Sequence, residues 1–162
     1  MLKFFRLFRS QYVGFWVLGL ALFALQEVPD MIMPFLHLEN NPIMNMQESS
    51  NVLNMAEKIL GSLCIATMIF VVSDKTTIWK TTDKRTIFLW CVIGVLLLNY
   101  FGWTLYFMGL QSKFVMMFFI VMLPPLFYVF VGLWRDNLLL AVLGCVFEVV
   151  HFTHVLGNLT LK

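Results

Sequence analysis

Two uninterrupted apolar runs decide the fold class of this chain: IFLWCVIGVLLLNYFGWTLYFMGL (Ile87–Leu110) and FVMMFFIVMLPPLFYVFVGLW (Phe114–Trp134). Neither run contains Lys, Arg, Asp or Glu, and each exceeds the roughly 20 residues that a helix needs to cross a bilayer. The whole chain agrees, because 60% of its 162 residues are hydrophobic, 12% are charged and the mean hydropathy is +0.86. These values lie outside the range of soluble domains.

Three further segments complete the set of predicted spans. The first is interrupted by polar residues at Gln26–Asp30, so we expect it to cross as a broken or kinked helix. Tandem prolines, Pro124 and Pro125, predict a kink within the fourth span. We therefore predict an all-α integral membrane protein, one five-helix transmembrane bundle over residues 1–162. Its spans are expected at about 12–38, 52–72, 87–110, 114–134 and 137–157.

Positive charge predicts how this bundle is oriented. Five spans place eight basic residues on one side of the membrane, Lys3, Arg6, Arg9, Lys75, Lys80, Lys84, Arg85 and Arg135, and three on the other, Lys58, Lys113 and Lys162. Cytoplasmic segments carry the excess of Lys and Arg. We therefore expect a cytoplasmic N-terminus, an external C-terminus and a multi-pass protein of the cell membrane, in particular the bacterial cytoplasmic membrane. Because topology explains the basic residues, the net charge of +2 indicates no nucleic-acid partner.

Ionisable side chains within the last span mark the candidate site. Glu148, His151 and His154 follow one another at three-residue intervals in an otherwise apolar run. A charged group near the bilayer centre costs about 2.5 kcal/mol or more, so such residues usually face a bundle interior, a cavity or each other. Glu148 and His151 are also spaced to interact along one helix.

Two acids of the first span lie at matching depths. Counting at the helical rise from Tyr12 and from the start of the last span, Glu27 and His151 lie about 21–22 Å from the cytoplasmic edge, and Asp30 and His154 about 26–27 Å. This match predicts two acid–histidine pairs between the first and fifth spans. Alternatively, the first helix ends near residue 28, and both acids are solvated at the outer interface.

A polar and aromatic stripe in the third span is a second candidate. Asn99, Trp103 and Tyr106 share one helical face by their spacing of four and three residues. Such a face can line a ligand pocket. It can equally pack against a neighbouring helix through a hydrogen bond from Asn99.

Three functions fit these candidate ligand-binding residues. The first is binding or transport of a small amphipathic or cationic molecule, held by the acids and by aromatic rings. The second is a relay of protons or ions, and the third is a metal site, for which one Glu-x-x-His is an incomplete ligand set. A different class is an interaction protein, such as an immunity factor or a transporter accessory subunit, whose polar residues bind a membrane-protein partner or a second copy. The sequence indicates no cofactor, and no arrangement of a nucleophile and a base favours an enzyme.

In length, in its five spans and in its Asn-aromatic third helix, the chain resembles the tryptophan-rich sensory protein (translocator protein) class of bundles. That resemblance implies binding of porphyrins or sterol-like ligands. The proline and tryptophan pattern of that family's first loop is absent from Glu39–Ser50, so the resemblance concerns architecture and carries over no residue.

Overall fold

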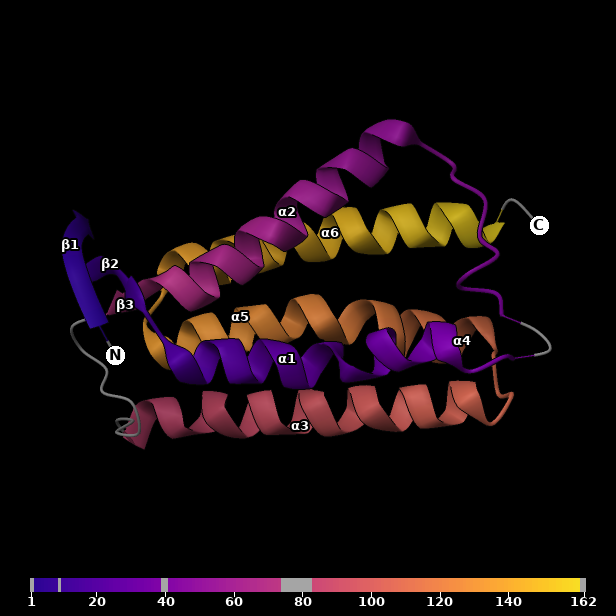
Figure 1. Ribbon diagram of the computed structural model, residues 1–162, viewed down its shortest axis with the longest axis horizontal. Coiled ribbons are helices and arrows are strands. Elements are labelled where there is room, and N and C mark those ends of the chain that lie inside the picture. The colour runs from indigo at the N-terminus through magenta and orange to yellow at the C-terminus, as the bar shows by residue number, and fades with distance from the viewer. Residues whose placement is uncertain (1, 9, 39–40, 74–82, 161–162) are drawn as a thin grey trace.

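Five long helices dominate this computed structural model, which describes residues 2–8, 10–38, 41–73 and 83–160. Within these ranges, five helical segments are long and apolar enough to cross a membrane, which confirms the expected number of long apolar helices. They alternate in direction along the long axis of the molecule (Figure 1). Their bounds are α1 (Val17–Ile32), α2 (Asn51–Phe70), α3 (Asp83–Phe107), the continuous stretch from α4 through η2 to α5 (113–135), and α6 (Leu138–Thr160).

Packing within the bundle is uneven. Helix α5 lies in the middle and packs closely on α3 and on α6, and α2 packs along α6. Glycine permits the closest of these approaches: a Cβ at Gly132 of α5 would lie 2.6 Å from the backbone nitrogen of Ala141 in α6. By contrast, α1 approaches α2 and α3 at few points. The space beside α1 is therefore filled less tightly than the rest of the interior.

A three-stranded antiparallel sheet covers the end of the bundle near the N-terminus (Figure 1). Its strands are β1 (Leu2–Phe8), β2 (Gln11–Phe15) and β3 (Val71–Ser73), in the order β1-β2-β3. The all-α prediction was therefore wrong here, and the first span does not begin at residue 12. Val13 pairs with Val71, and β-branched and aromatic residues favour strands where a partner strand is present.

Helix α1 runs without interruption through the segment that the sequence marked as a break. Pro29 lies inside the helix, which continues to Ile32 and then tightens into the 3₁₀ turn η1 (Met33–Phe35). Of the broken or kinked helix expected at Gln26–Asp30, the break was thus wrong, and the alternative in which the helix ends near residue 28 was wrong as well. Consequently the acids of this segment point from a regular helix rather than from an interfacial loop.

The tandem prolines lie at a change of helix type. The short α4 (Lys113–Val115) leads into the π-helix η2 (Met116–Met122), and Pro124 and Pro125 occupy the first turn of α5 (Leu123–Arg135). In a π-helix each N–H bonds the carbonyl five residues earlier. Pro124 has no N–H for the carbonyl of Phe119. That carbonyl instead accepts a hydrogen bond of 2.9 Å from the side-chain amide of Asn99 on α3.

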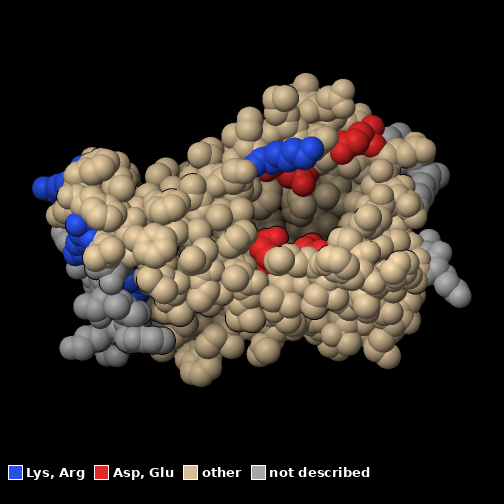
Figure 2. Space-filling model, viewed as in Figure 1, with Lys and Arg blue, Asp and Glu red and all other residues tan. Residues whose placement is uncertain are grey.

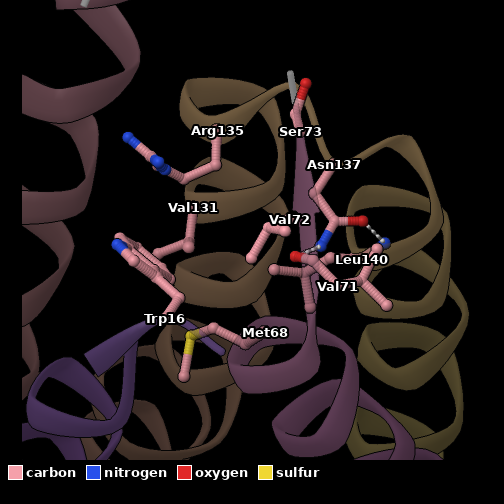
Figure 3. A pocket seen from close by; sticks show the side chains of 9 residues that line it. All are labelled: Trp16, Met68, Val71, Val72, Ser73, Val131, Arg135, Asn137 and Leu140. Carbon is pink, nitrogen blue, oxygen red and sulfur yellow. Dashed lines mark hydrogen bonds between the residues drawn. The ribbon is translucent and has the colours of Figure 1, made fainter. Parts of the chain in front are cut away.

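Asn137 joins α6 to the sheet end of the bundle. Its Oδ1 accepts the amide N–H of Leu140 at 3.1 Å, which caps α6, and its Nδ2 donates to the carbonyls of Thr67 and Val71, both at 3.1 Å. Figure 3 shows this side chain beside β3 at the edge of a small pocket. The pocket measures about 10 Å³, which is the minimum for one water molecule. Its role is therefore structural.

Arg135 lies in the same wall and is 5% exposed (Figure 3). Its guanidinium lies 4.7 Å from the ring centroid of Trp16 and 5.4 Å from that of Trp134, which are cation–π distances. Beside it, Arg85 pairs with Asp136 at 2.9 Å. Buried arginine and tryptophan thus fasten the sheet end of the bundle.

Candidate functional site

A cavity of about 320 Å³ lies between α1, α2, α5 and α6 and opens on one face of the molecule. Figure 2 shows this hollow, with acidic side chains at its edge and a basic side chain beside the opening. Its walls contain the carboxyl groups of Glu27, Asp30 and Glu57 and the imidazole of His151. Among the described residues, no Lys or Arg lines it. The wall therefore gathers three carboxyl groups and one imidazole inside an apolar bundle.

Helix α1 supplies one side of the cavity. Gln26, Glu27 and Asp30 fall within about one helical turn, and all three line the space. Gln26 is 3% exposed, and its Oε1 has no hydrogen-bond partner among the described residues. Buried polar atoms are normally paired. A ligand or water with a donor group would satisfy this acceptor.

Helices α2 and α6 supply the opposite side through an acid–histidine cluster. One oxygen of Glu57, Oε1, lies 3.1 Å from His151 Nδ1, and the other, Oε2, contacts His154 Nδ1. The second ring nitrogen of His154, Nε2, lies 3.2 Å from Glu48 Oε2. His154 is buried, whereas His151 reaches the cavity wall. Glu57 thus joins the two imidazoles.

The segment 41–50 crosses the outer end of the cavity. Tyr106 of α3 holds its beginning: the hydroxyl donates to Asn41 Oδ1 at 2.7 Å and accepts the N–H of Ile43 at 3.1 Å. Asn158 of α6 holds its end, because its Oδ1 accepts the N–H of Ser49 at 2.8 Å. Ile43 lines the cavity between these anchors. Residues 41–50, called the outer segment below, are therefore held in place by hydrogen bonds and form part of the site.

Aromatic rings complete the walls. Trp103, Tyr128 and Phe147 all line the cavity, and Phe147 lies 5.2 Å from the ring of His151. Trp103 is 1% exposed, and its Nε1 has no hydrogen-bond partner among the described residues. Rings of this kind can accommodate an apolar group or the face of a cation. An acceptor atom on a ligand would also satisfy the Trp103 indole.

Only some of the seven predicted site residues line the cavity. Four of them line the cavity: Glu27, Asp30, Trp103 and His151. His154 lies behind the wall and joins it through Glu57. Glu148 and Asn99 are not among the lining residues. Glu148 is half-buried, and one of its carboxyl oxygens lacks a hydrogen-bond partner among the described residues. Asn99 instead donates a hydrogen bond to the carbonyl of Phe119 in the π-helix.

The predicted acid–histidine partners differ from those observed. The sequence paired His151 with Glu27 and His154 with Asp30, whereas both imidazoles contact Glu57, and His154 also contacts Glu48. Sequence reasoning missed Glu57, because it assigned residues 52–72 to a span without considering the acid inside that range. Its position as a fourth acid within the predicted spans was the signal that could have found it.

No metal centre is assembled in the described part of the chain: it contains no group of three or more His, Cys, Asp or Glu that could hold an ion. No protein-family model, curated protein or solved structure matches this chain. The geometry of the cavity is therefore the observation on which a function can be proposed.

Proposed function

We propose that the chain is an integral membrane protein, with its N-terminus and sheet in the cytoplasm and its C-terminus outside, in the cell membrane of a bacterium. Large apolar side chains on the outer surface of the helices support insertion, among them Val17, Val52, Leu97, Phe114 and Val149. Soluble proteins rarely expose so extended an apolar surface. The excess of basic residues in segments joined to the sheet end supports the orientation.

Within that bundle, we propose that the cavity binds, or helps to move across the membrane, a small amphipathic cation. The observation that carries this proposal is the meeting of three carboxyl groups, from Glu27, Asp30 and Glu57, with aromatic rings around about 320 Å³ of space. Isolated carboxylates are costly in a low-dielectric interior, and a bound cation offsets that cost. The rings would hold the apolar part of the same molecule.

Benzyltrimethylammonium tests this proposal, because it joins an aromatic ring to a permanent positive charge. In lipid nanodiscs, we expect it to bind and to raise the thermal stability of the protein, and its uncharged tert-butyl analogue to bind at least about tenfold more weakly. The doubly substituted protein Glu27→Gln, Asp30→Asn should also lose at least about tenfold in affinity, because two of three cavity carboxylates are removed. Calorimetric titration measures both differences.

The matched control is Glu148→Gln, the same change at a half-buried acid that does not line the cavity. Its affinity should stay within about twofold of the wild type. Equal binding of the charged and uncharged ligands would refute the cationic site. Absence of any ligand response, together with one membrane protein that co-purifies in stoichiometric amount, would instead support the interaction protein.

A further inference from the structure

His154 bridges two carboxyl groups through its two ring nitrogens. Nδ1 contacts Glu57 in the bundle interior, and Nε2 lies 3.2 Å from Glu48. The side chain of Glu48 is 50% exposed, whereas that of His154 is 5% exposed. Because an imidazole can take a proton on one nitrogen and release one from the other, this arrangement joins the cavity wall to the outer surface.

Asn158 supplies a donor to Nε2, so it favours the form of the neutral His154 ring that carries its proton on Nδ1. Its Oδ1 accepts the N–H of Ser49, which fixes the amide so that Nδ2 faces His154 Nε2 at 3.2 Å. With the ring proton on Nδ1, the ring donates to the Glu57 carboxylate, and Nε2 accepts from Asn158. With the proton on Nε2, the ring donates to Glu48, and Nδ1 accepts from a protonated Glu57.

We propose that cation binding in the cavity is exchanged for a proton, which travels between the cavity and the outer surface along Glu57, His154 and Glu48. This inference rests on the cation site proposed above. Glu57 places one end of this path in the cavity wall, and half-exposed Glu48 places the other end at the surface. The two ring forms of His154 then correspond to the two states of the cavity.

The proton balance is simple. When a cation enters, the O–H bond of protonated Glu57 breaks and an N–H bond forms at His154 Nδ1, while the Nε2–H bond breaks and Glu48 accepts that proton and passes it to water. When the cation leaves, the same steps run backwards, so the ring needs no rotation between cycles. No electrons are transferred. The titratable groups that face this path are Glu57 from α2, Glu48 from the outer segment, His151 from α6 and, across the cavity, Glu27 and Asp30 from α1.

Rapid mixing of benzyltrimethylammonium with the protein in lipid nanodiscs tests the relay, because a bundle inserted as proposed above would have lipid over the opening of the cavity. A pH indicator in weakly buffered solution should report proton release by the wild type. His154→Asn should slow this release at least about tenfold, and imidazole added to the solution should restore the rate. The matched control is His37→Asn, the same change at an exposed histidine outside the chain of contacts.

Glu48→Gln provides a second variant, because a half-exposed side chain can be replaced without disturbing the bundle. It should slow release as well, since the amide cannot take up the proton. Cation binding with no proton release, or an unchanged release rate in both variants, would overturn the relay and leave the cation site standing. Absence of both binding and release in the wild type would overturn the cation site and the relay together.

Discussion

Gly61→Leu is expected to weaken cation binding strongly while the bundle stays folded. Gly61 lines the cavity from α2, and a Cβ there would lie 3.4 Å from Phe147 Cζ, which is an ordinary van der Waals contact. The rest of the leucine side chain would occupy space that the ligand needs. We expect the dissociation constant for benzyltrimethylammonium to rise at least about 100-fold, or about 2.7 kcal/mol.

The same change, Gly61→Leu, should make the folded protein more stable. Replacing a helical glycine lowers the conformational entropy of the unfolded chain, and filling an apolar space adds contacts, so Gly61→Leu should raise the free energy of unfolding by up to about 1 kcal/mol. The matched control is Gly94→Leu in α3, where an added Cβ meets nothing within 4 Å. Gly94→Leu should bind benzyltrimethylammonium with the affinity of the wild type. Full affinity in a stable Gly61→Leu protein would show that the ligand binds elsewhere.

Asn137→Ala is expected to destabilise the bundle strongly although the residue does not line the cavity. Asn137 is 2% exposed, caps α6 through Leu140, and donates to two carbonyls at the end of α2. Loss of a helix cap costs about 1 kcal/mol, and loss of the buried hydrogen bonds should bring the total to about 2–3 kcal/mol. Denaturant titration in mixed micelles measures this difference.

Asn51→Ala is the corresponding control, because Asn51 is exposed at the start of α2. We expect a change within about 0.5 kcal/mol there. Equal stabilities of the two variants would mean that the contacts of Asn137 do not hold α2 and α6 together. Cation affinity should be unaffected in both folded variants, since neither residue lines the cavity.

The five helices could be predicted from the sequence, because a long apolar run specifies a helix without reference to its neighbours. The second span was expected at 52–72 and lies at Asn51–Phe70, for example. The sheet could not be predicted in this way. The apolar residues 12–15 are compatible with a helix or with a strand. They form a strand because residues 71–73, distant in the sequence, lie beside them.

The error at the start of the first helix also explains the wrong histidine partners. Counting depth from Val17 rather than Tyr12 lowers both acids of α1 by about 7.5 Å. Asp30 then falls level with His151, and both line the cavity, while His154 lies too far along α6 for either acid. The sequence could therefore predict that polar residues of α1 and α6 line one cavity. It could not predict which acid pairs with which histidine, because that depends on where α1 begins.

The contact between Glu57 and His154 could be anticipated only by counting residues from the end of the bundle opposite the sheet. Glu57 lies six residues after the start of α2, and His154 lies six residues before the end of α6, so each is about 9 Å from the outer end of its helix. Equal depth suggests a pair, but only packing of α2 on α6 makes the contact. Glu48 was beyond such counting, because it belongs to an irregular segment whose path is set by Tyr106 and Asn158.

The most direct measurement is an experimental structure of the protein in lipid with 4-bromobenzyltrimethylammonium, whose bromine can be located by anomalous scattering. We predict the ammonium group between α1 and α2, at ion-pair distance from Glu27, Asp30 or Glu57, with its ring against Trp103 or Phe147. A structure in which α1 packs directly on α2 without a hollow, and in which bromine is found only on the outer surface, would contradict the proposed site.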